Sequence, residues 1–234
     1  MEKLIYLLWR PESSDAAPWG SSLRERLPAV LRKLDVRAAR LNLDDTDVAP
    51  AAALRQRRME AQPAAVLQVW VNSANDPLRA PLDAAVAAQA ARFAAYLVTE
   101  SVPLRNTQHP PRVGERTEGF AQIALLQRTP RLDAQAWRRH WQTVQTPVAI
   151  ETQSTFEYVQ NAVVRALTDG APPLDAIVEE CFPAAAMTDP QVFFDAPGDE
   201  AKFQRNLARM MDSVNRFLDL PIDCVPTSQY VLMA

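Results

Sequence analysis

The sequence is poor in the residues that most often build metal and nucleophile sites. It has only two cysteines, Cys181 and Cys224, and only two histidines, His109 and His140. The cysteines have neither metal-ligand spacing nor a C-x-x-C pattern, and no H-E-x-x-H motif is present. We therefore expect no metal site and two reduced thiols.

Other familiar signatures are missing too. There is no G-x-G-x-x-G, no P-loop and no G-x-S-x-G, which argues against the common nucleotide-binding and acyl-transfer classes. No stretch approaches the roughly 18 apolar residues needed to cross a bilayer, and the opening MEKLIYLLWRP is too short for a secretory signal. We expect a cytoplasmic protein with no membrane partner.

Lysine is almost absent, and arginine supplies nearly all the positive charge. The formal net charge is -3, so the sequence does not predict the clustered basic face that a nucleic-acid partner requires. No nucleic-acid partner is expected. The lysines are Lys3, Lys33 and Lys202.

What is present suits a packed globular protein with an internal repeat. Of the 234 residues 48% are hydrophobic and 23% charged, enough to bury a substantial core. The segments LLWRP and LLQRTP each end an apolar, strand-like run, and their arginines, Arg10 and Arg128, lie 118 positions apart. This spacing is about half the chain, so the order of elements in each half becomes the test of duplication.

Both halves show the same order of expected elements. In the first half these are strand Lys3–Arg10, a helix opened by a capping box at Ser22 and Glu25, strands Val36–Asn42 and Ala64–Val71, helix Asp83–Phe93 and strand Ala95–Val102. In the second half they are strand Phe120–Gln127, helix Ala134–Gln145 with Asp133 as N-cap and an end before Pro147, a strand within Thr155–Leu167, strand Ala176–Phe182, helix Asp199–Leu218 and strand Cys224–Met233.

A β-α-β-β-α-β order repeated twice predicts an α+β fold of two tandem ferredoxin-like halves. We expect an N-terminal half at residues 1–103, a linker at 104–118 and a C-terminal half at 119–234. A four-stranded sheet with apolar residues on both faces must cover the face that its helices leave bare. The halves should therefore pack sheet to sheet as an intrachain α+β barrel, and a homodimer built on that barrel stays open. An RNA-binding ferredoxin-like sheet is disfavoured, because paired sheet aromatics are lacking.

The second half also resembles the EthD family, a branch of the dimeric α+β barrel superfamily. Its members show H-W-x-x-V-H-x-P, then Y-x-x-N, D-G-x-x-E-x-x-F and D-E-x-x-F. The matching residues here are His140, Trp141, Val144 and Pro147, then Tyr158 and Asn161, then Asp175, Glu179 and Phe182, then Asp199, Glu200 and Phe203. Gln145 replaces the second histidine of the pattern, Ala176 a glycine and Cys181 a common aromatic, and the first half resembles the family in element order only.

The resemblance implies a small organic molecule bound between the sheet and the helices, without a cofactor. Family members are linked to degradative operons and to cofactor-free oxygenation, cyclisation or isomerisation of small cyclic or aromatic compounds. It implies His140 as general base. The residues expected to contact the substrate are Trp137, Trp141, Gln145, Tyr158 and Asn161. Related barrels use a helix histidine to ligate haem, but no other feature of this sequence supports haem.

Several of these residues have a plain structural alternative. His140 could instead satisfy a backbone carbonyl between two tryptophans, and the tryptophans could simply be core. Tyr158 and Asn161 lie three apart on a strand, so they should point to opposite faces and could not both line one pocket without a bulge.

The adjacent carboxylates Glu179 and Glu180 are expected to differ. Glu179 lies in an apolar strand, where a half-buried carboxylate needs a partner such as Arg128 or the imidazolium of His140, and it is our second candidate catalytic residue. Glu180 is expected to be solvated. The main hypothesis is an EthD-like protein that binds a small, largely apolar molecule, with His140 as base if it is an enzyme; the alternative is a non-catalytic ligand-binding or accessory protein of a degradative pathway.

Overall fold

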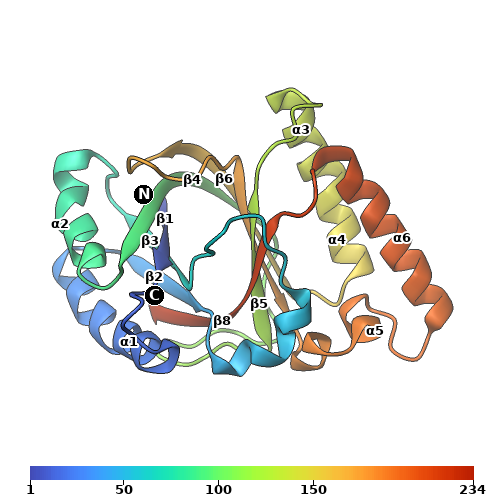
Figure 1. Cartoon of the computed structure of the whole chain (residues 1–234), viewed down its shortest axis with the longest axis horizontal. Helices are drawn as coiled ribbons and strands as arrows, with labels where there is room; N and C mark the ends of the chain where they lie inside the picture. The colour runs from blue at the N-terminus through green and yellow to red at the C-terminus, as the bar shows by residue number, and fades with distance from the viewer.

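Eight antiparallel strands form a closed barrel in the computed structural model, which describes all of residues 1–234. The order around the barrel is β1-β3-β2-β8-β5-β7-β6-β4 (Figure 1). The strands are β1 Glu2–Trp9, β2 Ala38–Leu43, β3 Ala65–Val71, β4 Arg92–Leu104, β5 Phe120–Leu126, β6 Glu157–Ala166, β7 Ala176–Phe182 and β8 Asp223–Met233.

Helices cover the outer wall of the barrel on two opposite sides, α1 and α2 on the first half and α3, α4 and α6 on the second (Figure 1). None of them combines the length and the apolar character that crossing a bilayer would demand. The helices are α1 Ala16–Lys33, α2 Asp76–Ala87, α3 Ala134–His140, the π-helical turn η2 Trp141–Gln145, α4 Thr146–Thr152, α5 Pro190–Phe193 and α6 Glu200–Phe217, with short 3-10 helices η1 Thr46–Leu54 and η3 Ala184–Met187.

Each half has the strand order of a ferredoxin-like sheet. The first reads β4-β1-β3-β2 and the second β8-β5-β7-β6, and hydrogen bonds between β2 and β8 and between β4 and β6 join their edges. The predicted tandem of ferredoxin-like halves closing into an intrachain α+β barrel is confirmed. Closure leaves no strand edge unpaired, so neither half offers an edge to another chain.

The strands read as continuous apolar runs because both of their faces are buried. In β1, Leu4, Tyr6 and Leu8 pack against the helices, whereas Ile5 and Leu7 belong to the cluster inside the barrel. Burying each such side chain stabilises the fold by roughly 1.5–3 kcal/mol.

Equivalent backbone hydrogen bonds align the two halves residue by residue. The Ala64 amide donates to the Leu8 carbonyl at 2.9 Å, and the Asp175 amide donates to the Leu126 carbonyl at 2.9 Å. β1 and β5 therefore correspond with an offset of 118 positions, the spacing of the sequence repeat, and β3 and β7 with an offset of 111.

The predicted capping box at Ser22 and Glu25 is wrong. Helix α1 begins six residues before Ser22, with Asp15 as its N-cap residue. The additional turns bring Trp19 onto the buried face of the helix, where its indole N–H donates to the Gln89 carbonyl at 2.6 Å. Burial of this large side chain outweighs the local capping preference of the serine.

Helix α2 also begins earlier than the predicted Asp83–Phe93. It starts at Asp76 and ends at Ala87. Arg79, only 6% exposed, pairs with Asp76 at 2.8 Å and with Asp83 at 2.9 Å, so its ion pairs stabilise the first turns. Residues from 92 onward belong to β4 instead.

The segment predicted as a linker packs on the barrel. The Thr117 amide donates to the Gln229 carbonyl at 2.8 Å, and the Thr117 hydroxyl donates to the Gln229 side-chain oxygen at 2.7 Å. Val113 forms a further bridge to Val231. The connection between the halves is thus held against β8.

Candidate functional site

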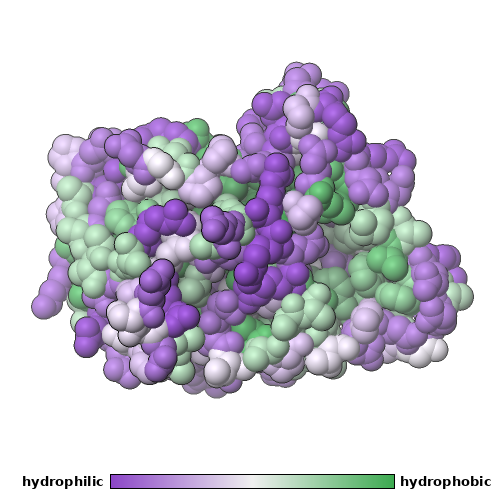
Figure 2. All heavy atoms as spheres, viewed as in Figure 1, coloured by the Kyte–Doolittle hydropathy of each residue, from purple (hydrophilic) through white to green (hydrophobic).

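A cavity of about 430 Å3 lies between the outer face of the second half's sheet and the helices that cover it, and Ala53, Leu54 and Gln56 of the first half complete its wall. Its walls are mainly apolar, and apolar side chains also gather on the surface over α4 and α6 (Figure 2). The size is within the usual range for small-molecule sites. The apolar walls include Val178, Phe193, Met210, Val214 and Phe217.

The alignment of the halves explains why the cavity forms only in the second one. Tyr6 fills the corresponding space of the first half with a buried ring, whereas its equivalent, Ala124, leaves room. Two further exchanges replace an apolar side chain by a polar one: Leu4 corresponds to Gln122, and Val69 corresponds to Glu180.

Four buried polar atoms in this cavity have no hydrogen-bond partner in the chain. They are the Trp141 indole nitrogen and one side-chain oxygen each of Gln145, Gln153 and Glu180. Only eight such atoms occur in the whole protein, so half of them line one cavity. A buried polar atom without a partner costs about 1–3 kcal/mol, a cost that a bound molecule with matching groups would offset.

The π-helical turn η2 positions two of these groups, because Trp141 and Gln145 are its first and last residues. The amide and hydroxyl of Thr146 both donate to the Trp141 carbonyl, the hydroxyl at 2.9 Å. The prediction that the helix ends before Pro147 is wrong, since the helix runs on to Thr152. The π turn places the proline in the first turn of α4, where its missing N–H is tolerated.

Glu180 is the carboxyl group of the cavity. Burial raises its pKa to about 8. Tyr158 lies opposite it on β6, and burial, together with the Glu180 charge, raises the pKa of that phenol. Burial and then the same carboxyl raise the pKa of the Cys224 thiol to about 12. No arginine, lysine or histidine lines the cavity, so Glu180 lacks a cationic partner there.

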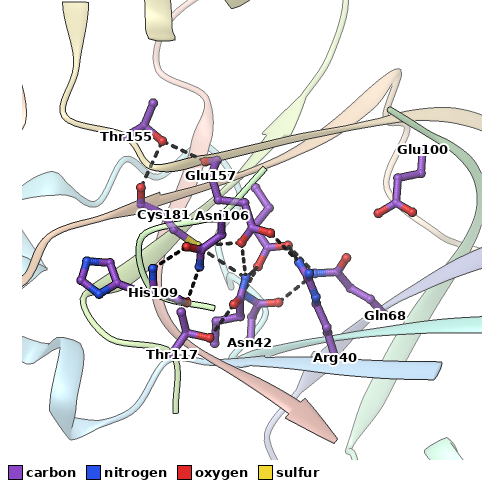
Figure 3. Close-up of polar contacts among 12 residues, drawn as sticks. Arg40, Asn42, Gln68, Glu100, Asn106, His109, Thr117, Thr155, Glu157 and Cys181 are labelled. Carbon is purple, nitrogen blue, oxygen red and sulfur yellow. Dashed lines mark hydrogen bonds and ion pairs between the residues drawn. The ribbon is translucent and has the colours of Figure 1, made fainter. Parts of the chain in front are cut away.

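Glu179 occupies the opposite face of β7, inside the barrel. The predicted partners of Glu179, Arg128 or His140, are wrong. Arg40 lies 3.7 Å from Glu179 and also 3.2 Å from Glu157. Figure 3 shows this interior cluster, with Arg40 and Gln68 facing Glu157 and Cys181. The amides that donate to Glu179 are those of Asn42 at 2.7 Å, Gln229 at 2.8 Å and Gln68 at 2.9 Å.

The electrostatics of Glu179 suit a structural role. Burial alone would raise its pKa, but Arg40 and the three amides outweigh that effect and hold the pKa below the usual value. The prediction that Glu180 is solvated is wrong, because one of its oxygens is fully buried without a partner. Of the two neighbours, Glu180 rather than Glu179 is thus the carboxylate that faces the cavity.

His140 lies outside the cavity. Its Nε2 is 3.1 Å from the Ser213 carbonyl oxygen, and its ring is 5.2 Å from that of Phe217. The imidazole therefore joins α3 to α6, which is the structural alternative that the sequence left open. The resemblance implied that His140 acts as base on a molecule between the sheet and the helices, whereas its side chain turns toward α6.

The other proposed site residues lie in three environments: the core beneath the helices, the barrel interior and the cavity wall. Trp137 is core, with its indole N–H donating to the Phe217 carbonyl at 2.8 Å. Asn161 lies in the barrel interior and its side-chain amide donates to the Ile177 carbonyl at 3.1 Å. Asn161 and Tyr158 thus lie on opposite faces of β6, as strand geometry predicts. The proposed residues that line the cavity are Trp141, Gln145 and Tyr158.

Sequence reasoning missed Glu180, Gln122, Gln153 and Cys224, all of which line the cavity. A signal existed for two of them. Polar Gln122 and Glu180 interrupt the outward faces of strands whose counterparts in the first half are apolar, and aligning the repeats would have exposed the exchange.

The cavity does not offer a metal or haem ligand set. The groups that can ionise among its lining residues are Tyr158, Glu180 and Cys224, and the protein has no cluster of three or more residues with metal-binding side chains. A haem held by a helix histidine would need an imidazole directed into the cavity. Because His140 is bonded to the Ser213 carbonyl, this chain does not supply that ligand.

The closed barrel of two ferredoxin-like halves, with a cavity under the helices, defines a protein of the dimeric α+β barrel class. Residues 129–221 match the model of the EthD domain. This part of the second half therefore resembles the EthD domain, as the four sequence patterns predicted. None of the curated proteins matches the chain.

Solved structures align with nearly the whole chain at very low sequence identity. An anthrone oxidase-like protein aligns over 99% of this chain and 93% of its own, with a TM-score of 0.57 and 7% identity. A proposed monooxygenase from Lactobacillus acidophilus NCFM aligns over 100% and 97%, with a TM-score of 0.49 and 9% identity. A variant of chlorite dismutase from Candidatus Nitrospira defluvii aligns over 97% and 91%, with a TM-score of 0.42 and 11% identity. The first of these supports the fold.

Proposed function

We propose that this protein binds a small, largely apolar organic molecule in the cavity of its EthD half. The observation that carries the proposal is the set of four unpartnered polar atoms in one mainly apolar space. Apolar walls supply affinity by burying the ligand's surface, and a few convergent polar groups fix its orientation.

The unpartnered polar atoms indicate which hydrogen-bonding groups the ligand carries. Trp141 offers a hydrogen-bond donor, which suits a carbonyl or ether oxygen. Gln145 directs its amide nitrogen to the Met210 sulfur at 3.2 Å, which leaves its oxygen as an acceptor for a ligand hydroxyl. A volume of about 430 Å3 accommodates a skeleton of roughly two or three fused rings with such oxygen substituents.

Cofactor-free oxygenation, isomerisation or cyclisation remains part of this proposal, in line with the EthD match and with the anthrone oxidase-like neighbour. A general base is needed for such chemistry, and His140 is turned toward Ser213. Glu180, with a pKa near neutrality and a place in the cavity wall, is the better candidate.

The alternative is a ligand-binding or accessory protein without catalysis. Gln145, which stands where the EthD pattern has its second histidine, favours it, because an amide cannot exchange a proton near neutral pH. Binding is common to both candidates, so binding is tested first.

The binding test uses 2-naphthol as probe, followed by calorimetry and by thermal shift. The wild-type protein is expected to bind it and to gain stability by mass action, about 2.7 kcal/mol at a hundredfold excess over Kd. Ala124→Phe, which restores the ring present at Tyr6 in the first half, should fill the cavity and weaken binding at least tenfold while the fold is kept.

Val164→Phe is the matched control, because it adds the same ring at a position of β6 that is 55% exposed and outside the cavity. It should bind as the wild type does. Equal affinity of the Ala124→Phe and wild-type proteins would contradict the proposed site.

A further inference from the structure

The cavity has the parts of a site that removes a proton from carbon. We propose that Glu180 is a catalytic base and Trp141 an oxyanion donor, and that the substrate class is a small cyclic ketone with an acidic hydrogen next to its carbonyl. This inference rests on the proposed binding function and names its chemistry.

The first part is a carboxylate in an apolar space. Glu180 projects from β7 into the cavity with one oxygen fully buried and unpartnered. Gln122 and Tyr158 are its neighbours on β5 and β6, and neither carries a charge near neutral pH. A carboxylate without a cationic partner is a stronger base than a solvated one.

The second part is a donor on the facing wall. Trp141 is 0% exposed and starts the π turn that covers the sheet, and its indole N–H has no acceptor in the chain. The Tyr158 hydroxyl lies close to both groups, since the Glu180 charge raises the pKa of this phenol and a polar contact with the Trp141 side chain lowers it. The Glu180 carboxylate on the sheet and the Trp141 indole N–H on the π turn therefore lie on facing walls of the same part of the cavity.

These two groups match the two ends of an enolisation. The carboxylate takes the proton as the C–H bond breaks, the bond's electron pair becomes the C=C bond, and the carbonyl π pair moves to oxygen. The indole N–H then donates to the resulting enolate oxygen. Return of the proton from the Glu180 carboxyl restores the ketone, so the step is balanced without oxidant or cofactor. Preorganised donors at a developing oxyanion commonly contribute about 10²–10³ in rate.

Other charged groups around Glu180 do not replace it as the base. From β8, Cys224 faces it as a thiol whose pKa is raised to about 12. The 3-10 helix η1, the π turn η2, the helices α5 and α6, and the residues that follow η1 and α4 contribute only amide, indole and apolar side chains to the lining. Arg55 and Asp223 act on Cys224 from beyond the cavity wall.

The experiment follows hydrogen–deuterium exchange at C1 of 2-tetralone in D2O by proton NMR, with binding of the same ketone measured separately by calorimetry. The wild-type protein should bind it and accelerate exchange above the protein-free rate, with a rise toward a plateau above about pH 8, the pKa of Glu180. Glu180→Gln should keep binding and lose at least tenfold in exchange rate.

Three further variants test the assigned roles. Trp141→Phe should slow exchange about tenfold or more at retained binding, with near-UV circular dichroism as the check on its fold. Glu180→Asp retains a carboxylate, so it should recover part of the rate that Glu180→Gln loses. His140→Gln lies outside the cavity and should exchange as the wild type does.

The outcomes separate the two proposals. Binding of 2-tetralone without exchange, or exchange that persists in Glu180→Gln, overturns the inference and leaves ligand binding intact. Failure of 2-tetralone to bind, where 2-naphthol binds, overturns the substrate class alone. Failure of both probes to bind counts against the proposed function itself.

Discussion

The adjacent residues Glu179 and Glu180 lie in opposite electrostatic environments. Glu179 points into the barrel, where Arg40 and three amides stabilise its charge, and Glu180 points into an apolar cavity without a cation. A strand places neighbouring side chains on opposite faces, so one peptide step separates an ionised structural residue from one that keeps its proton near neutral pH.

Glu180 should make stability depend on pH. Its folded-state pKa of about 8 is above the ordinary value of 4.5, so between these values the folded protein retains a proton that the unfolded chain releases. Stability should thus fall as the pH rises from 4.5 to 8, by up to about 1.4 kcal/mol per unit. Glu180→Gln removes this dependence. In urea unfolding, the free energy of unfolding of this variant should therefore rise relative to that of the wild type between pH 5 and pH 8.

Glu25→Gln neutralises an exposed carboxylate and serves as control. Its stability difference from the wild type should stay nearly constant over the same range. If the Glu180→Gln difference were also constant, the burial of this carboxyl would be refuted.

At the scale of elements, strands were easier to predict than helix ends. Every strand was found within a few residues, because long apolar runs between turns specify a buried strand. The starts of α1 and α2 and the passage through Pro147 were missed. Tertiary hydrogen bonds of Trp19 with Gln89, of Arg79 with Leu167 and of Thr146 with Gln160 favour the observed helices.

Thr146 links the π turn to the sheet, and its loss should be costly. Its hydroxyl donates to the Trp141 carbonyl and accepts from the Gln160 amide at 2.6 Å. Thr146→Val keeps the shape but leaves that buried amide unpaired, for an expected loss of about 1–3 kcal/mol in urea unfolding.

Thr152→Val is the matched control. The Thr152 hydroxyl is also buried, but it makes a single hydrogen bond, to the Val148 carbonyl one helical turn back at 2.7 Å. A smaller loss is expected there, and equal losses would show that the contact from η2 to β6 contributes nothing of its own.

At the scale of the molecule, the barrel interior ties the halves together. Arg40 comes from the first half, and the carboxylates that it pairs with, Glu157 and Glu179, come from the second. The polar cluster shown in Figure 3 is therefore complete only when the barrel closes.

Arg40→Met should destabilise both halves at once. It leaves two buried carboxylates without their cation, a change that typically costs about 3–5 kcal/mol. Urea unfolding followed by circular dichroism and by tryptophan fluorescence should give one coincident transition at a lower midpoint. Arg216→Met, which breaks an exposed pair with Asp212, should stay within about 0.5 kcal/mol of the wild type. Separate transitions for the two probes would contradict the shared interior.

The sequence by itself determined the repeated order of elements and the likeness of the second half to the EthD domain, because both depend on periodicity and spacing along the chain. It also required Tyr158 and Asn161 to face opposite ways, as it did Glu179 and Glu180. Only the tertiary structure decided which of each pair meets the cavity. Alternation along a strand specifies that neighbouring side chains lie on opposite faces, but it does not specify which face the helices cover. The orientation of the His140 side chain toward Ser213 likewise depends on how α3 and α6 pack.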